Sequence, residues 1–197
     1  MMKGKAFVHY VRIKLGFDRP HTQTTWREQQ KIKQYSKGAN LAAEIGVYEG
    51  VNTLNIALSM SEKGTLYAID PFFPGILGIC WSKLIARHTI QLNGFMNKVI
   101  WIEDLSSAVA SMIPENLDFI FIDGDHTWNG IEADWLNYSK KVSIGGYIAL
   151  HDTHCKQGED VSHKLDTYKY YREVIAKDER FEEIDSIDSL SVLRRKA

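Results

Sequence analysis

The chain has 197 residues, of which 44% are hydrophobic and 25% are charged, and its formal net charge at pH 7 is -1. This length allows one sizeable hydrophobic core, and the composition is ordinary for a soluble globular protein. The near-neutral charge excludes a global basic excess of the kind that binds nucleic acid. No apolar run approaches the ~18 residues of a membrane span. We therefore expect a single domain over residues 1–197, with no nucleic-acid or membrane partner.

The N-terminal segment, residues 1–38, is predicted to be helical. Residues 5–17 are weakly amphipathic, and we expect them to pack into the core or a loop. The next stretch, TTWREQQKIKQYSKG, offers Thr24 or Thr25 as a helix cap, helix-forming residues through Lys37, and Gly38 as a stop.

Short apolar runs then alternate with segments of helical character. Strands are expected in the runs LAAEIG, TLYAID, KVIWIE, LDFIFID and GGYIALHD, which are residues 41–46, 65–70, 98–103, 117–123 and 145–152. Crossover helices are expected near residues 51–62, 80–94, 105–112 and 128–141. The last two apolar runs, FEEIDSI and SLSVLRR, are too close together for a crossover helix, so they predict an antiparallel hairpin that turns near residues 185–188.

This alternation predicts an α/β fold, a doubly wound Rossmann-like domain with a mostly parallel sheet and an antiparallel C-terminal hairpin. We expect successive strands to lie side by side. In such a sheet, ligands bind outside the carboxyl ends of the strands.

Acidic residues end all five predicted parallel strands: Glu44, Asp70, Glu103 with Asp104, Asp123, and Asp152 beside His151. Clustered like charges repel one another, so sheet stability does not explain this pattern. A cationic or hydroxyl-rich ligand at the shared edge would relieve the repulsion.

The turn EIGVYEG follows the first strand. Gly46 and Gly50 allow a ligand to approach the backbone closely, but Tyr48 takes the middle position of the G-x-G-x-x-G fingerprint, which disfavours a pyrophosphate site. Asp70 ends the second strand, where doubly wound nucleotide folds bind ribose hydroxyls. Glu103 or Asp104 is then placed to meet an adenine amino group, with a solvated acid as the alternative for either, and the sequence does not choose between them.

The turn EIGVYEG, the strand end YAIDPF, the stretch FIDGDHTWNGIEADW and the strand GGYIALHDT together resemble the class I S-adenosylmethionine-dependent methyltransferases, in the branch of small-molecule O-methyltransferases. The resemblance runs from about residue 35 to the C-terminal hairpin. It implies a seven-stranded sheet, a methionine end of the cofactor lined by Glu44, Gly46 and Gly50, and a ribose held by Asp70. The residues expected at S-adenosylmethionine are Glu44, Gly46, Val47, Tyr48, Gly50, Asp70, Pro71, Glu103, Asp104 and Asp123.

A second site is expected around Asp123 and Asp152, because neighbouring parallel strands lie ~4.8 Å apart and two carboxylates at their ends can bind one hard cation. His151 is a candidate third ligand or a group just outside the ligand shell, and a divalent ion such as Mg²⁺ would favour a deprotonated hydroxyl. His126 follows Asp123 by three residues and is the candidate base. This arrangement is similar to metal-dependent catechol and macrolide-sugar O-methyltransferases. Their fifth strand gives two adjacent oxygen ligands where this chain has His151 and Asp152.

The expected function is methyl transfer from S-adenosylmethionine to a hydroxyl of a small acceptor. Residues 72–96 and 153–172 are expected to select the acceptor, together with the N-terminal segment. One alternative is a non-catalytic nucleotide-binding regulatory module on the same fold. Another is a phosphatase, because DGDHT fits a D-x-D-x-T motif with Asp123 as nucleophile and Asp125 as acid.

The two cysteines, Cys80 and Cys155, are too few for a disulfide framework and lack metal-site spacing. We expect both to be ordinary thiols and the compartment to be the reducing cytoplasm. The sequence does not indicate the oligomeric state, so a homo-oligomer stays open.

Overall fold

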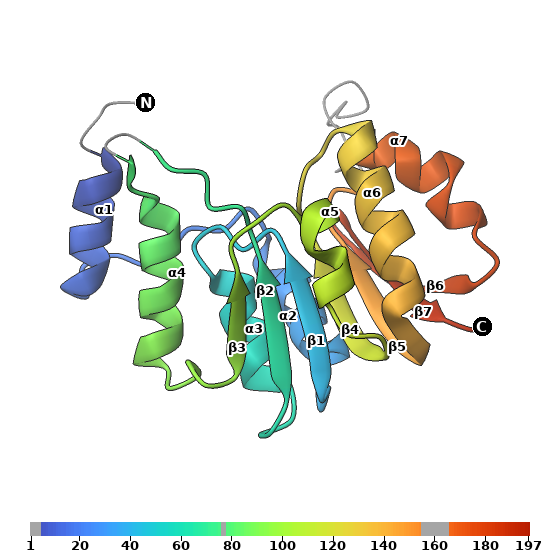
Figure 1. The fold of residues 1–197 in the computed structure, drawn as a ribbon, viewed down its shortest axis with the longest axis horizontal. Coiled ribbons are helices and arrows are strands. Elements are labelled where there is room, and N and C mark those ends of the chain that lie inside the picture. The colour runs from blue at the N-terminus through green and yellow to red at the C-terminus, as the bar shows by residue number, and fades with distance from the viewer. Residues whose placement is uncertain (1–4, 76–77, 155–165) are drawn as a thin grey trace.

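The protein is described by a computed structural model over residues 5–75, 78–154 and 166–197 (Figure 1). Seven strands form one sheet in the order β3-β2-β1-β4-β5-β7-β6. The first five are parallel, and β7 runs antiparallel to both β5 and β6. The predicted α/β fold, with its mostly parallel seven-stranded sheet and C-terminal hairpin, is confirmed. The strands are β1 Leu41–Ile45, β2 Thr65–Ile69, β3 Val99–Ile102, β4 Leu117–Ile122, β5 Val142–Leu150, β6 Phe181–Ile187 and β7 Leu190–Arg195.

Helices cover both faces of this sheet (Figure 1). Buried side chains of α2, α3 and α4 pack with one face, and those of α5, α6 and α7 pack with the other. The α-helices are α1 Lys5–Lys14, α2 Trp26–Tyr35, α3 Val51–Ser59, α4 Trp81–Leu92, α5 Ser106–Val109, α6 Trp128–Tyr138 and α7 Asp166–Glu173, and short 3₁₀ turns follow at Ala110–Met112, Ser139–Lys141 and Ile175–Lys177. Within the described ranges, no helix has the length and apolar character that crossing a membrane requires.

The central strand β4 shows why these residues form a buried sheet. Ile120 and Ile122 pack toward α5, α6 and α7, whereas Phe119 and Phe121 pack toward α2, α3 and α4. Successive side chains of a strand point to opposite faces, so a strand covered on both faces is apolar along its whole length. The polar residues that follow such a strand are therefore confined to its end.

The expectation that successive strands lie side by side is wrong at two steps, because β7 lies between β5 and β6, and β3 is separated from β4. β3 and β4 are consecutive in the chain but lie on opposite sides of the β1–β2 pair, and β4 pairs with β1. The chain winds outward through β3 and then returns to the centre, which creates a topological switch point between β1 and β4. Ligands of doubly wound sheets bind at this point.

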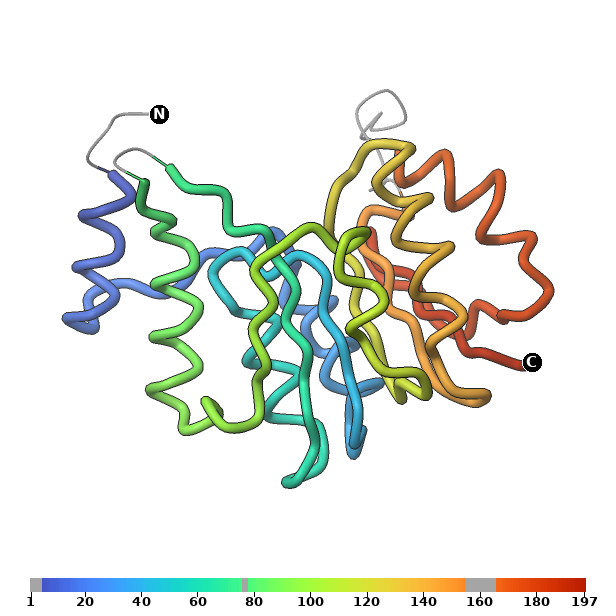
Figure 2. The backbone as a smooth tube through the Cα atoms, viewed as in Figure 1, coloured from blue at the N-terminus to red at the C-terminus, as the bar shows by residue number. Residues whose placement is uncertain are grey.

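Residues 5–14, within the N-terminal segment expected to be helical, form a helix in which Ile13 is buried. Helix α1 packs on α4, where Phe7 and Tyr10 contact the ring of Trp81 at centroid distances of 5.3 and 5.5 Å. Figure 2 shows α1 and the C-terminal strands at opposite sides of the molecule. Of the two segments expected to select the acceptor, residues 76–77 and 155–165 lie outside the described residues, as does Cys155.

Candidate active site

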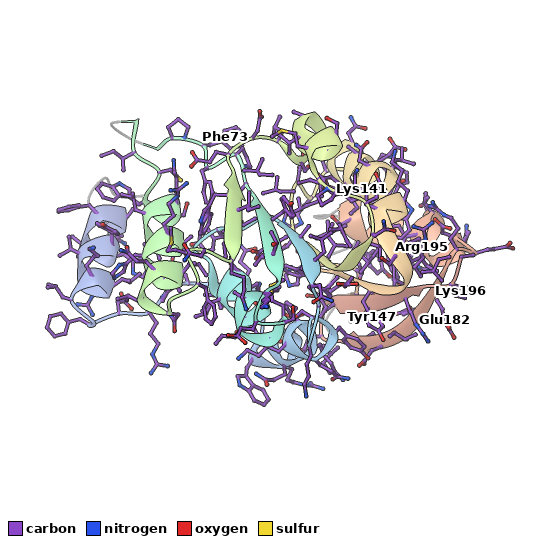
Figure 3. The ribbon with its side chains drawn as sticks, turned by 60° about the horizontal axis from the view of Figure 1, so that its bottom comes forward. Phe73, Lys141, Tyr147, Glu182, Arg195 and Lys196 are labelled. Atoms are coloured by element: carbon purple, nitrogen blue, oxygen red, sulfur yellow. The ribbon has the colours of Figure 1, made fainter. Side chains whose placement is uncertain are left out.

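A cavity of about 540 Å³ opens at the carboxyl ends of β1, β2 and β4. Its wall combines the turn after β1, the loop after β2, the start of α5 and the loop after β4, with residues 21–23 of the N-terminal segment. Phe73 lies on the loop after β2 and is 72% exposed, well separated from Tyr147 on β5 and Glu182 on β6 (Figure 3). Of the expected site residues, the cavity wall includes Gly46, Val47, Tyr48, Asp70, Pro71, Asp123 and His126.

The turn after β1 brings two strand ends into contact. Gly46 has φ +85°, and a side chain there would overlap the backbone carbonyl of Asp123. Glycine is therefore required both for the left-handed conformation and for the close approach of the two backbones. Gly50 begins α3 with φ +80°, and its Cα faces the Cα of Ala86 in α4, so it serves helix packing and is not on the cavity wall.

Asp70 holds this turn in place. Its Oδ2 accepts hydrogen bonds from the backbone N–H groups of Val47 at 2.9 Å and Tyr48 at 3.0 Å, and its Oδ1 accepts one from Phe72 at 2.7 Å. Tyr48 and Phe72 both have positive φ values, 53° and 44°, and such strain persists only where the surroundings enforce it. A carboxylate has about four acceptor sites, so Asp70 retains capacity for a ligand hydroxyl.

Glu44 lies behind the turn and is fully buried. In the described part of the chain, neither of its carboxylate oxygens has a hydrogen-bond partner. Burial raises the pKa of Glu44 well above its ordinary value, and the charges of Asp70 and Asp123 add to this effect. An unpartnered carboxylate of this kind fits a cationic group, such as the amino group of S-adenosylmethionine, which would provide the missing hydrogen bonds.

Glu103 and Asp104 are engaged with the protein and are not on the cavity wall. Glu103 forms ion pairs with Lys83 and Arg87 of α4, and the Asp104 carboxylate accepts a hydrogen bond from the Leu105 N–H. Leu105 and the next residue, at the start of α5, line the cavity instead.

The ends of β4 and β5 bring together Asp123, His126, His151 and Asp152. His151 Nδ1 lies 3.0 Å from Asp123 Oδ1 and 3.3 Å from Asp152 Oδ2. His126 Nε2 is 3.8 Å from Asp123 Oδ1, and its Nδ1 is 3.6 Å from Asp152 Oδ2. Asp152 has φ +57°, a conformation that aspartate tolerates better than most residues. Neighbouring strands thus deliver two carboxylates and two imidazoles to one place, as the sequence predicts.

His151 is buried and faces a third carboxylate. Its Nε2 lies 3.5 Å from Oε2 of Glu28, which is fully buried in the first turn of α2. Burial alone would lower the pKa of His151, but its interactions with Asp123, Asp152 and Glu28 raise it to about 12. Without an ion, His151 is therefore an imidazolium that neutralises part of the surrounding negative charge.

The same residues fit a divalent ion. Nδ1 of His151 and oxygens of Asp123 and Asp152 all lie within 4.8 Å of one another. Two ligands that bind one octahedral ion at ~2.1 Å lie about 3 Å apart, close to the 3.0 and 3.3 Å seen here. An ion at this place would take the position of the Nδ1 proton.

Sequence reasoning missed Glu28 and Asp166. The pattern Thr25-x-x-Glu28 indicates a capping box, which the structure contains, but nothing in it indicates the contact with His151. Asp166 begins α7, and its carboxylate accepts a hydrogen bond from the Trp128 N–H at 3.2 Å, which holds the loop that carries His126. Its backbone N–H donates to the His126 carbonyl oxygen at 3.2 Å.

Asp125 is not free for the acid role that a phosphatase motif requires. Its two carboxylate oxygens accept hydrogen bonds from the backbone N–H and the hydroxyl of Thr127, each at 3.0 Å. The motif also follows the fourth strand of the chain instead of the first. Asp125 therefore shapes the turn before α6.

Comparison with known proteins shows what the chain is similar to. Caffeoyl-CoA O-methyltransferase 1 of Zea mays is 30% identical over 122 residues, which cover 59% of this chain and 44% of that protein. Protein R132 of Acanthamoeba polyphaga mimivirus is 30% identical over 114 residues, or 55% of this chain and 49% of that protein. The chain thus spans about half the length of these curated relatives.

The fold also matches a solved structure. An O-methyltransferase from Bacillus cereus, in complex with SAH, superposes with a TM-score of 0.71 at 17% identity, covering 99% of this chain and 93% of that one. A family model described as a methyltransferase domain matches residues 43–153, which include β1 through β5 and the strand-end cluster. The phosphatase and regulatory-module alternatives find no support in these comparisons. By its match to this model over more than half of its length, the chain belongs to the methyltransferase domain family.

Proposed function

We propose that the chain transfers the methyl group of S-adenosylmethionine to a hydroxyl of a small-molecule acceptor, with His126 as the base. One observation carries this proposal. A single cavity is lined by the turn at Gly46 and by Asp123 and His126, and the backbones of Gly46 and Asp123 are in contact. A methyl donor on the turn and a hydroxyl beside Asp123 would therefore be neighbours.

The turn after β1 and the loop after β2 would bind the cofactor. Gly46, Val47 and Tyr48 present backbone groups to its methionine part, with Glu44 behind them for the amino group. The free acceptor capacity of Asp70 suits a ribose hydroxyl, and the adjacent Pro71 lies on the same wall. The adenine would lie toward the start of α5, and direct contacts from Glu103 or Asp104 stay predictions.

The chemistry requires alignment more than activation of the donor. S-adenosylmethionine, when bound, supplies an electrophilic methyl carbon on a positively charged sulfur. Methyl transfer would form a bond between the acceptor oxygen and this carbon as the carbon–sulfur bond breaks. The electron pair of the broken bond would stay on the sulfur of S-adenosylhomocysteine. His126 takes the hydroxyl proton, and holding the reacting atoms in line contributes up to ~7–11 kcal/mol.

Asp123, His151 and Asp152 would hold a divalent ion beside this hydroxyl. The ion supplies positive charge that favours the deprotonated oxygen. His126 lies next to this cluster and is 33% exposed by its side chain, so it can contact both the acceptor and solvent. Proton transfer away from the site is thus open to His126 but not to the buried His151.

The acceptor is proposed to be a small hydroxylated molecule with an apolar part. The cavity wall includes the aromatic residues Phe72 and Phe73, and the hydroxyl and amide groups of residues 22 and 23. The Zea mays relative is named for caffeoyl-CoA, so phenolic hydroxyls are the first acceptors to test.

The test is an assay for S-adenosylhomocysteine release with a panel of phenolic and sugar acceptors. His126→Asn is expected to lower turnover by about 10²–10⁴-fold while leaving cofactor affinity unchanged, because a general base contributes a factor of this size. His88→Asn, on α4 and away from the cavity wall, is the matched control and should keep full activity.

Chelation separates the role of the ion from that of the base. Treatment with EDTA should abolish turnover, and added divalent ion should restore it. Full activity in EDTA would show that catalysis needs no ion. Full activity of His126→Asn would show that His126 is not the base.

A further inference from the structure

Glu28 is a carboxylate held rigidly behind the proposed ion site. It comes from α2, outside the sheet, and is fully buried. Its Oε1 accepts hydrogen bonds from the N–H and hydroxyl of Ser189 at 2.9 and 2.7 Å, and its Oε2 accepts one from the Thr25 N–H at 2.6 Å. These bonds fix both oxygens, and Oε2 also faces Nε2 of His151 at 3.5 Å.

This arrangement favours one orientation of His151. Its Nδ1 faces carboxylate oxygens of Asp123 and Asp152 at 3.0 and 3.3 Å, and without an ion a proton on Nδ1 satisfies these contacts. An ion that binds Nδ1 takes the place of this proton, and the one N–H of the ring is then on Nε2. Glu28 Oε2 lies 3.5 Å from Nε2, so a carboxylate already faces that N–H.

We propose that His151 is a nitrogen ligand oriented by Glu28, and that the site therefore selects a first-row transition metal such as Mn²⁺, Fe²⁺, Co²⁺ or Zn²⁺ in preference to Mg²⁺. The proposal rests on the ion site of the proposed function and names the class of ion it takes. Glu28 is a positioning residue, since it reaches the ion only through His151.

The physical basis is the match between ligand and metal. Mg²⁺ prefers oxygen ligands and keeps much of its water, whereas imidazole suits transition metals. A carboxylate that accepts the second N–H of a metal-binding histidine fixes the ring and makes its free nitrogen more basic. Glu28 Oε2 faces the second ring nitrogen of His151 at 3.5 Å, where such a carboxylate would lie, and α2 thereby adds a third carboxylate to those of Asp123 and Asp152.

Spectroscopy of the wild-type protein tests the nitrogen ligand directly. The metal is removed with a chelator, Mn²⁺ is added without acceptor, and electron spin-echo modulation is recorded. We expect coupling to a ¹⁴N nucleus that disappears in His151→Asn and persists in His126→Asn. Absence of coupling in the wild type, or its persistence in His151→Asn, would overturn the proposal.

Calorimetry tests the selectivity. Transition metals bind most sites more tightly than Mg²⁺, so the informative quantity is the ratio of Co²⁺ to Mg²⁺ affinity. His151→Asn replaces the nitrogen by an amide oxygen and should lower this ratio at least about tenfold. An unchanged ratio would contradict the assignment.

Glu28→Gln tests the positioning role. Glutamine can still accept the capping hydrogen bond from the Thr25 N–H, and we expect Co²⁺ affinity to fall about 10- to 100-fold. A thermal unfolding curve checks that the variant is folded. A folded variant with wild-type Co²⁺ affinity would show that Glu28 has no role beyond structure.

These outcomes are separable from failure of the proposed function. A protein that shows the nitrogen coupling but methylates no acceptor would contradict the proposed function and support this inference. A protein that methylates acceptors with Mg²⁺ as its preferred ion, without nitrogen coupling, would support the proposed function and contradict this inference.

Discussion

Asp70 is expected to support the cofactor site through the backbone as well as through any contact with the ribose. Its carboxylate accepts three hydrogen bonds from backbone N–H groups, those of Val47, Tyr48 and Phe72. In Asp70→Asn, one oxygen becomes an N–H₂ group that cannot accept, and the amide is neutral. The change therefore removes at least one hydrogen bond to a charged acceptor and leaves a backbone donor unpaired.

The expected magnitude follows from that loss. A hydrogen bond to a charged group contributes about 1.5–3 kcal/mol, so we take a loss of about 2 kcal/mol. For a chain of this size, the melting temperature would fall by roughly 4–8 °C. If the full loss of about 2 kcal/mol falls on the free energy of ligand binding, the affinity for S-adenosylhomocysteine would fall about 30-fold.

Asp118→Asn is the matched control. Its Oδ2 accepts hydrogen bonds from the backbone N–H groups of Asn40 and Leu41 at 2.8 and 3.1 Å, at the amino end of β1 and away from the cavity. We expect it to lower the melting temperature without changing ligand affinity in calorimetry. The reasoning is refuted if Asp70→Asn binds the ligand as tightly as the wild type, or if both variants weaken binding equally.

Gly46→Ala should lower the free energy of unfolding by at least about 2 kcal/mol and abolish ligand binding, because alanine disfavours φ +85° and its methyl group would overlap the facing backbone; a stable variant that binds the ligand would contradict this. Burial raises the pKa of Asp134 from 3.8 to about 6. Its ionised form is therefore disfavoured in the folded state, and stability should decline as pH rises from 3.8 to 6, so Asp134→Asn should stabilise the protein by up to about 3 kcal/mol at pH 7 and little at pH 3.5. Equal melting temperatures of Asp134→Asn and wild type at pH 7 would count against this. Burial alone would lower the pKa of His9, but its hydrogen bonds with Glu49 and Asp18 raise it above 6.5. The stabilisation by protonated His9 is present below pH 6.5 and is lost as pH rises through the raised pKa. The hydrogen-exchange protection factors of residues 5–14, which correct for the intrinsic pH dependence of exchange, should therefore fall toward alkaline pH in the wild type but not in His9→Asn.

The sheet and its acidic edge could be predicted because both depend on short-range patterns. A strand buried on two faces must be apolar throughout, so its polar ends stand out in the sequence. Asp123 and Asp152 were placed together on this basis, and they do share one cluster with His126 and His151. The order of β3 and β4 could not be predicted in the same way, because apolar runs do not say which strands pair.

The contacts that the sequence could not predict are long-range ones. Glu28 has a complete local explanation as a capping residue, and its burial against His151 depends on how α2 docks beside β5 and the C-terminal hairpin. Ser106 lies on the cavity wall because the chain turns into α5 there, and no residue pattern marks it. The sequence does not predict helix α7, because its eight residues, DTYKYYRE, include no aliphatic side chain. Its packing against α6, where Tyr170 contacts Trp128, explains its position.

The central claim is that the turn after β1 binds an adenosyl cofactor next to the cluster at Asp123. Isothermal titration calorimetry of the purified chain with S-adenosylhomocysteine, NAD and ATP tests it most directly. We predict saturable binding of S-adenosylhomocysteine at one site per chain, and no comparable binding of NAD or ATP. Preferential binding of NAD or ATP, or no binding of S-adenosylhomocysteine, would contradict the account.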